Sequence, residues 1–175
     1  MGRPSGRAVG ERAAKGDETV TLWKSVLGLL AWLAVTFAAA SVGARFMPGA
    51  WYETIVRPSW TPPNAIFAPV WTVLYVLMAV AAWLVWRKAG FAGASAPLLL
   101  FVAQLVLNAT WSYLFFGAHR IGAAAVEILV LWAFILATFI GFWAQTRLAG
   151  ALLVPYVLWV GFASALNLAL WRLNP

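Results

Sequence analysis

Five long apolar stretches, separated by short polar or basic segments, make up most of the chain. Stretches without Asp, Glu, Lys or Arg extend over residues 25–44, 58–86, 89–119, 128–146 and 148–171. Each has about the 20 residues that an α-helix needs to cross roughly 30 Å of hydrocarbon. The pattern therefore predicts an all-α integral membrane protein, a bundle of five transmembrane helices near residues 26–45, 65–86, 97–117, 121–145 and 149–171.

The first 21 residues differ, because charged residues alternate there with glycine and alanine and show no apolar periodicity. Such a segment buries too little apolar surface to fold, so we expect a disordered polar tail over residues 1–21 and one membrane domain over residues 22–175. A secretory signal is the competing interpretation, since residues 38–44 resemble a cleavage site. The apolar run before them is too long for a signal peptide.

Composition agrees with this class, since 64% of the residues are hydrophobic and 10% are charged. The chain has no cysteine, which excludes disulfides and thiolate metal sites. Its net charge of +7 comes from dispersed residues that flank the spans, so nucleic-acid binding is not predicted. The single histidine, His119, is expected to be solvated in a loop, and no metal site is predicted.

Basic residues are unevenly divided between the two membrane faces. With five spans, the N-terminal side carries Arg3, Arg7, Arg12, Lys15, Lys24, Arg87, Lys88 and Arg147, and the other side carries Arg45, Arg57, Arg120 and Arg172. The excess favours a cytoplasmic N terminus in a bacterial inner membrane, with an outer membrane as the alternative. Without the tail, the two sides carry four basic residues each.

Aromatic and polar side chains share one face on several predicted helices. At about 100° per residue, one face of the second helix carries Phe67, Trp71 and Tyr75, and one face of the third carries Gln104, Asn108 and Trp111. The amides are expected to face inward, because an unsatisfied polar group in hydrocarbon costs on the order of a few kcal/mol. Trp132 and Trp159 lie on similar aromatic stripes of the last two helices.

The chain contains 12 tryptophans, and they need not share one role. Tryptophan is enriched at membrane interfaces, and Trp23, Trp83, Trp86 and Trp171 fit such a belt. Trp32 and Trp143 fit either role. The tryptophans that recur beside Asn, Gln, Tyr or Pro favour a binding pocket, with simple packing as the alternative: Trp51, Trp60, Trp71, Trp111, Trp132 and Trp159.

Prolines stiffen the approach to the second helix and interrupt the fifth. Pro58, Pro62 and Pro63 fix an extended loop, because proline locks its own φ and disfavours helix at the preceding residue. Pro155 is predicted either to kink the fifth helix and widen the space beside it, or to mark the loose start of that helix.

These residues occur in the order found in one known family. The chain resembles the TspO/MBR family, which includes the tryptophan-rich sensory and translocator (peripheral-type benzodiazepine receptor) proteins. The resemblance rests on Trp51-Tyr52, on residues 58–63 (PSWTPP) followed by Phe67 and 71–75 (WTVLY), on 108–117 (NATWSYLFFG), and on 155–159 (PYVLW) with Leu166-Asn167.

The resemblance implies a dimeric five-helix bundle with a cavity for flat apolar ligands, closed by the first loop, here residues 46–64. Porphyrins such as protoporphyrin IX or haem are the implied ligands, with no obligatory cofactor, and synthetic benzodiazepine-site ligands share the cavity. The implied ligand contacts are Trp51, Trp60, Phe67, Trp71, Tyr75, Asn108, Trp111, Trp132 and Trp159. Sterol binding is not supported, because Tyr113 and Tyr156 lack a basic residue at the required spacing.

Three functions fit this sequence. The first is a membrane sensor or regulator that binds porphyrins. The second is light-dependent porphyrin degradation, for which Trp71 and Trp159 are the candidate redox-active residues because indoles can be oxidised; no ordinary acid–base or nucleophilic constellation is present. The third is a porphyrin or sterol transporter, which the lack of an internal repeat disfavours. Glu127, an acid inside a span, is expected to face another helix or the membrane edge and not the ligand, with a proton-relay role as the alternative.

Overall fold

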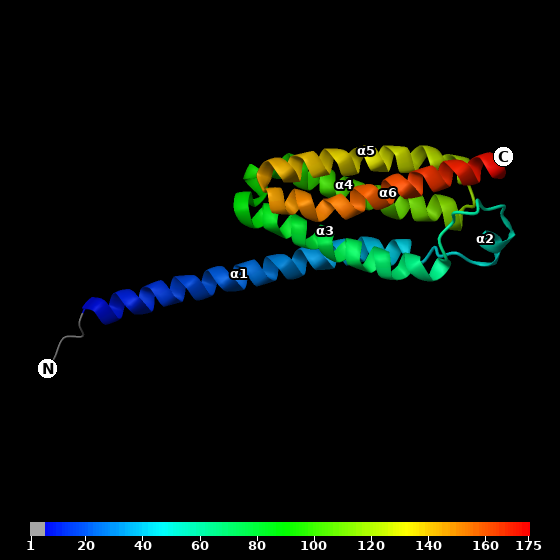
Figure 1. Ribbon diagram of the computed structural model, residues 1–175. Coiled ribbons are helices and arrows are strands. Elements are labelled where there is room, and N and C mark those ends of the chain that lie inside the picture. Colours follow the sequence, from blue (N-terminus) through cyan, green and yellow to red (C-terminus); the bar gives the residue numbers. More distant parts are fainter. Residues whose placement is uncertain (1–5) are drawn as a thin grey trace.

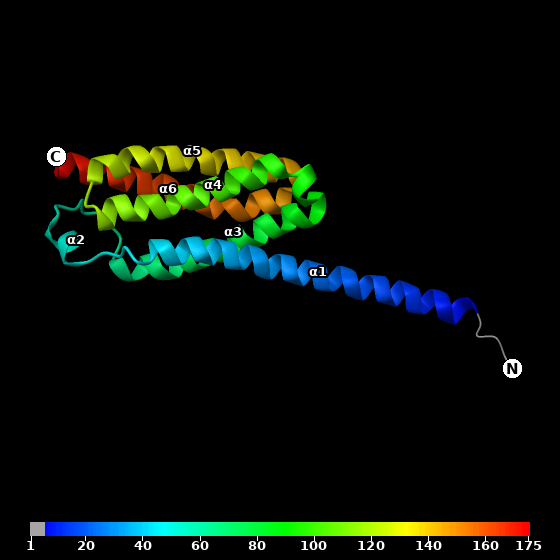
Figure 2. The ribbon, with the colours of Figure 1, turned by 180° about the vertical axis from the view of Figure 1, so that it is seen from behind.

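The computed structural model describes the backbone of residues 6–175 and the side chains of residues 22–175. Within this part the chain forms α1 (Gly6–Gly43), α2 (Ala50–Thr54), α3 (Asn64–Gly93), α4 (Ser95–Ser112), a π-helical turn η1 (Tyr113–Gly117), α5 (Ile121–Gln145) and α6 (Arg147–Leu173). The long helices lie side by side in a bundle, and α1 projects beyond it at one end (Figures 1 and 2). Disorder was predicted for residues 1–21. Of these, residues 1–5 lie outside the described part and residues 6–21 are described by their backbone alone, so the disorder of this segment stays a prediction.

Five helical segments are long and apolar enough to cross a membrane, namely α1 from Leu22, α3, α4 with η1, α5 and α6. This confirms the predicted all-α, five-span membrane bundle. Large apolar side chains such as Leu99, Ile140 and Leu158 are 65–69% exposed on the outside of the bundle. Such exposure suits side chains that face lipid instead of water.

The structure adds three local features to the predicted helices. A short helix, α2, lies within the first loop, which occupies residues 44–63 and is called the lid below. Helix α3 is longer than predicted, and Gly90 interrupts it with φ 64° and ψ −175°, a conformation open to glycine but costly for other residues. The third span ends in the π-helical turn η1, where the amide of Ala118 donates to the carbonyl of Tyr113.

The bundle core is closely packed because small residues let the helices approach. Helix α6 packs most extensively against α5 and also contacts α3, whereas α1 lies at the edge against α3 and α4. Met78, Ala82 and Val85 on α3 are fully buried against bulky residues such as Tyr156. On α1, a Cβ added at Gly28 would lie 2.1 Å from the Trp86 ring, so this close helix contact requires glycine.

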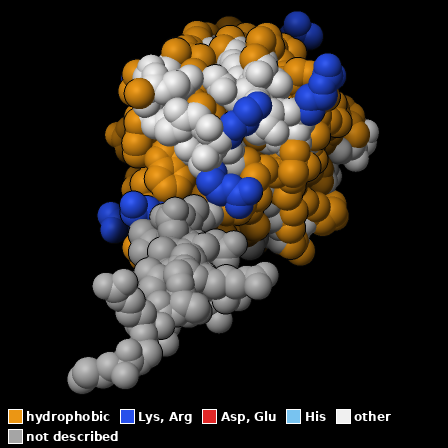
Figure 3. All heavy atoms as spheres, turned by 90° about the vertical axis from the view of Figure 1, so that its left-hand side faces the viewer, with side chains coloured by type: hydrophobic (Ala, Val, Ile, Leu, Met, Phe, Trp, Pro, Cys, Tyr) orange, Lys and Arg blue, Asp and Glu red, His pale blue; other side chains and the backbone are white. Residues whose placement is uncertain are grey.

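The two ends of the bundle differ in charge and in structure. One end carries Lys24, Arg87, Lys88 and Arg147 and shows basic but no acidic side chains among the described residues (Figure 3). Two of these guanidinium groups lie over indole rings, Arg87 over Trp83 at 4.7 Å and Arg147 over Trp143 at 5.7 Å. The opposite end carries the lid and the C terminus (Figure 1).

Candidate functional site

A cavity of about 310 Å³ lies under the lid, between α1, α3, α4 and α6. Its volume falls at the lower end of the range for small-molecule sites, roughly 300–1,000 Å³. Aromatic and small side chains form nearly all of its surface: Phe37, Ala40, Gly43, Ala44, Phe46, Met47, Pro48, Phe67, Ala68, Trp71, Thr72, Tyr75, Trp111, Ser112, Phe116, Trp159 and Ala163. The cavity is therefore suited to a mostly apolar ligand.

Aromatic contacts hold the walls of the cavity together. The rings of Phe67 and Trp159 meet edge to face at 5.9 Å, joining α3 to α6. One turn further along α3, the Trp71 ring lies 5.6 Å from Tyr75 and 6.2 Å from Tyr156. Such aromatic pairs stabilise their geometry by about 0.5–1.5 kcal/mol beyond simple burial. The indole faces at the cavity are thus fixed in advance of any ligand.

A buried chain of hydrogen bonds runs from the cavity wall into the core. The Tyr75 hydroxyl donates to Asn108 Oδ1 at 2.7 Å, and Asn108 Nδ2 donates to the Tyr156 hydroxyl at 3.2 Å. The Tyr156 hydroxyl donates in turn to Gln104 Oε1 at 2.7 Å. Gln104 and Asn108 are only 1% and 3% exposed, which confirms that both amides face inward. Because Tyr75 already donates its proton to Asn108, its hydroxyl oxygen can act toward a ligand only as an acceptor.

Among the described residues that line the cavity, one buried side-chain polar atom has no hydrogen-bond partner. The indole Nε1 of Trp159 is buried and has no hydrogen-bond acceptor among the described residues. The indole of Trp111, by contrast, donates to Asn167 Oδ1 at 2.9 Å. Leaving a buried donor unpaired costs roughly 1–3 kcal/mol. Trp159 lines the cavity while its indole N–H is buried beside it, so a ligand carbonyl or carboxylate can satisfy this donor only if the indole ring shifts toward the cavity.

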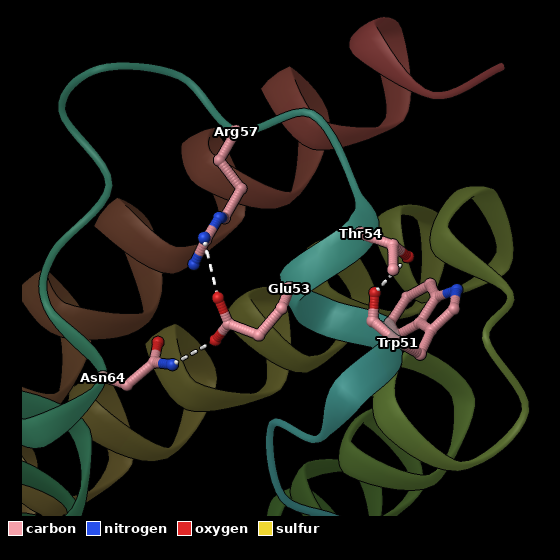
Figure 4. Close-up of polar contacts among 5 residues, drawn as sticks. All are labelled: Trp51, Glu53, Thr54, Arg57 and Asn64. Atoms are coloured by element: carbon pink, nitrogen blue, oxygen red, sulfur yellow. Dashed lines mark hydrogen bonds and ion pairs between the residues drawn. The ribbon is translucent and has the colours of Figure 1, made fainter.

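The lid is braced by polar contacts on its outer side. Glu53, on α2, receives hydrogen bonds from Arg57 Nη2 at 3.0 Å and from Asn64 Nδ2 at 3.1 Å, one on each carboxylate oxygen (Figure 4). Asn64 is the first residue of α3, so the carboxylate links α2 to the start of the second span. Trp51 points to the other side of α2 (Figure 4).

The inner side of the lid is apolar and is anchored by Tyr52. This residue is 2% exposed and packs edge to face on Phe115 and Phe116 of η1. Burial raises the pKa of the Tyr52 hydroxyl above its ordinary value, an effect that the Arg57 guanidinium opposes. The lid is therefore closed most stably when Tyr52 is neutral.

The structure brings five of the nine predicted ligand residues together at the cavity: Phe67, Trp71, Tyr75, Trp111 and Trp159. Asn108 lies behind this wall and bonds to Tyr75. Three predicted residues do not line the cavity. Trp132 donates to the carbonyl of Val157 and lies against Gly161, so its indole is placed between α5 and α6 and not at this cavity.

The other two are lid residues that contact the far side of the bundle. Trp51 stacks on His119 at 4.2 Å, and Trp60 meets Phe162 edge to face at 5.7 Å. His119 is exposed in the loop between η1 and α5, as expected, and the structure adds that its ring stacks on an indole and that its backbone has a positive φ of 55°. Trp60 remains one aromatic contact away from the cavity, since Phe162 also packs against Trp159 at 5.8 Å.

Sequence reasoning missed several residues of the cavity. Phe37 belongs to α1, which showed no aromatic and polar face. Phe116 reaches the cavity because the π-helical turn rotates the end of the third span, and no sequence rule used above signals such a turn. Pro155 lies eight residues after the first residue of α6, so it is an interior proline and not a helix start.

Glu127 does not line the cavity, in agreement with the sequence prediction. Its side chain belongs to α5, and neither carboxylate oxygen has a hydrogen-bond partner among the described residues. The described residues contain no cluster of His, Asp or Glu able to hold a metal ion.

The fold and the site define a multi-pass α-helical membrane protein with an aromatic cavity that the start of its first loop helps to line. The sequence model of the TspO/MBR family matches residues 21–172, and the chain belongs to that family. It is 40% identical over 159 residues to the tryptophan-rich protein TspO of Chlorobaculum tepidum, covering 87% of this chain and 99% of that protein. It is also 41% identical over 141 residues to protein CrtK of Rhodobacter capsulatus (78% of this chain, 86% of that protein) and 39% identical over 138 residues to the human translocator protein (76% and 82%).

Proposed function

We propose that the protein is a membrane sensor or regulator that binds porphyrins, such as protoporphyrin IX or haem, in the cavity beneath the lid. The observation that carries this proposal is the wall of aromatic rings around the cavity, beside which the buried Trp159 indole N–H has no partner. Tetrapyrrole rings stack well on indole faces, and their propionate carboxylates supply the acceptor that Trp159 lacks. The relatives named tryptophan-rich and translocator proteins are compatible with this function.

The size of the cavity adds a condition to the proposal. A volume of about 310 Å³ encloses only part of a substituted tetrapyrrole. Binding the whole macrocycle therefore requires the cavity to widen, and an outward movement of the peripheral helix α1 can provide this space with the lid in place.

The proposal is tested by titrating the detergent-solubilised protein with protoporphyrin IX in the dark. Binding predicts saturable quenching of tryptophan fluorescence, with the pigment recovered intact afterwards. Quenching that rises linearly without saturation, or no quenching at all, contradicts the proposal. A matched detergent sample of free tryptophan corrects for absorption by the pigment.

Light-dependent porphyrin degradation is a second candidate function, favoured by one specific arrangement. Trp71 and Trp159 both line the cavity, and the Trp71 ring is within 6.2 Å of two tyrosine rings that could share an oxidised state. Such a reaction needs light and an external oxidant such as dissolved oxygen. Loss of porphyrin absorbance under illumination only, abolished by Trp71→Phe or Trp159→Phe, would establish it.

Porphyrin or sterol transport is the remaining alternative and has less support. Five spans cannot divide into two equal repeats, which many secondary transporters use for alternating access. Uptake of porphyrin into sealed vesicles beyond the binding capacity of the protein would favour transport.

We also propose an orientation in which the basic end faces the cytoplasm of a bacterium and the lid faces the outside. The basic residues at the end away from the lid follow the positive-inside rule (Figure 3). Labelling of single cysteines introduced at Gly93 and at Thr54 with an impermeant thiol reagent in intact cells tests this. Labelling at Gly93 but not at Thr54 would reverse the orientation.

A homodimer is the assembly we propose. The α1 and α4 helices leave an outward-facing groove between them, lined by small and β-branched residues including Val35, Ala38, Val106 and Ala109. Gly141 faces Pro97 and Gly161 faces Trp132, so these two glycines make their close contacts within the chain. Cross-linking between Val106→Cys copies in lipid, absent for Leu158→Cys, tests this face.

A further inference from the structure

The lid reaches across the whole end of the bundle. It leaves α1 and returns to α3, two neighbouring helices, but its middle part lies beside the C-terminal end of α6 (Figures 1 and 2). There it makes the aromatic contacts already described, between Trp60 and Phe162 and between Trp51 and His119. Aromatic packing attracts without strict direction, so these contacts alone permit the lid to tilt or slide.

One directional contact fixes the lid to α6. The amide of Val56 donates to Asn174 Oδ1 at 3.0 Å, and Asn174 Nδ2 donates back to the carbonyl of Val56 at 3.0 Å. The Asn174 side chain thus satisfies both backbone groups of one residue, as a paired residue does in an antiparallel sheet. Among the described residues, this is the one hydrogen-bonded link between the lid and α6.

Asn174 is itself held in place by the last turn of α6. Its Nδ2 also donates to the carbonyl of Leu170 at 2.9 Å, and its backbone amide donates to the same carbonyl at 3.0 Å. The residue lies directly after α6 and does not line the cavity. It can therefore act on a ligand only through the position of the lid.

We infer that Asn174 is a positioning residue, a clasp that keeps the lid closed over the cavity and sets the rates at which a ligand enters and leaves. This inference rests on the proposed ligand-binding function. The clasp joins two parts of the protein and touches no ligand, so it stabilises the closed lid whether the cavity is empty or filled. Breaking it speeds ligand association and dissociation together and leaves the affinity nearly unchanged. A residue of the cavity wall, by contrast, changes the affinity.

The experiment compares Asn174→Ala and Asn174→Asp with a control variant, Thr54→Val. The Thr54 hydroxyl donates to the carbonyl of Trp51 within α2, so its loss removes a lid hydrogen bond that does not reach α6 (Figure 4). Hydrogen exchange at the Val56 amide reads the clasp directly, without any ligand. Stopped-flow quenching by protoporphyrin IX in the dark gives the association and dissociation rates.

In Asn174→Ala we expect the Val56 amide to exchange about tenfold faster, because two hydrogen bonds across the lid are lost. Both porphyrin rates rise by about the same factor, and their ratio stays within about twofold of the native value. Asn174→Asp keeps an acceptor for the Val56 amide, so the exchange rate of this amide should lie between the rates in the native protein and in Asn174→Ala. Thr54→Val behaves like the native protein in both measurements.

Unchanged exchange at Val56 in Asn174→Ala would overturn the clasp. Faster exchange with native porphyrin rates would show that the clasp exists but does not gate the cavity, which overturns the inference as stated. If the native protein binds no protoporphyrin IX, the gating role falls with the proposed function. Exchange at Val56 then still decides whether Asn174 holds the lid.

Discussion

Replacing Asn108 with leucine tests the buried chain of hydrogen bonds that supports the cavity wall. The two side chains have similar volumes, so the change removes the amide without leaving a large void. The Tyr75 hydroxyl then loses its acceptor, and the Tyr156 hydroxyl loses one donor but keeps its bond to Gln104. One buried donor is left unpaired, which predicts a loss of about 1–3 kcal/mol in the free energy of unfolding.

A double-mutant cycle with Tyr75→Phe separates this cause from a general disturbance of packing. Tyr75→Phe removes the donor and leaves Asn108 Oδ1 unpaired, so each single variant is destabilised. In the double variant neither partner remains, and the combined loss is smaller than the sum of the two single losses. Cycles on hydrogen bonds between membrane helices predict a coupling of about 0.6–1.7 kcal/mol.

The assay is reversible unfolding in mixed micelles, followed by near-ultraviolet circular dichroism. Thr54→Val is the control, because the exposed Thr54 hydroxyl bonds only to the Trp51 carbonyl of its own helix. Its effect should stay within about 0.5 kcal/mol. Losses from Asn108→Leu and Tyr75→Phe that add without coupling would refute the reasoning.

Three further predictions follow from individual contacts. Trp159→Phe and Trp111→Phe remove the same indole atoms, but of the two indole N–H groups only that of Trp111 has a hydrogen-bond partner. Trp111→Phe should therefore lower the free energy of unfolding by about 1 kcal/mol more than Trp159→Phe does, and Trp159→Phe should weaken porphyrin binding roughly fivefold to tenfold. Equal free energies of unfolding, or native porphyrin affinity in Trp159→Phe, would contradict this prediction. Gly28→Ala should destabilise the fold by about 1–3 kcal/mol, because its Cβ would overlap the Trp86 ring, whereas Gly49→Ala, with no atom nearer than 4.0 Å, should not; thermal unfolding compares them. Because burial raises the pKa of Tyr52, the neutral hydroxyl contributes stability that is present below about pH 10 and is lost as the pH rises through the folded-state pKa. Raising the pH through this range should expose the Val56 amide to hydrogen exchange in the native protein and not in Tyr52→Phe.

The helices could be predicted from the sequence because hydrocarbon leaves little choice of structure. A span without charged residues must satisfy its own backbone, so α5 was placed at residues 121–145, the bounds that the structure gives. The inward orientation of Gln104 and Asn108 followed from the same cost of unpaired polar groups.

The lid and the turn η1 could not be predicted in this way. Their conformations depend on contacts between distant segments, such as Tyr52 on Phe115 and Val56 on Asn174, which no local pattern encodes. Helical periodicity predicts which residues share a face of one helix, but it does not predict which other helix packs against that face. For this reason Trp71 was correctly placed at the cavity, whereas Trp132 was not.

The most direct test of the central claim is porphyrin binding by variants that fill the cavity or add the same bulk outside it. Ala163 lines the cavity on α6, and Ala165 is exposed on the outer face of the same helix. Titration with protoporphyrin IX in the dark should show saturable quenching for the native protein and for Ala165→Phe, and none for Ala163→Phe. Saturable binding by Ala163→Phe with native affinity would show that the porphyrin does not occupy this cavity.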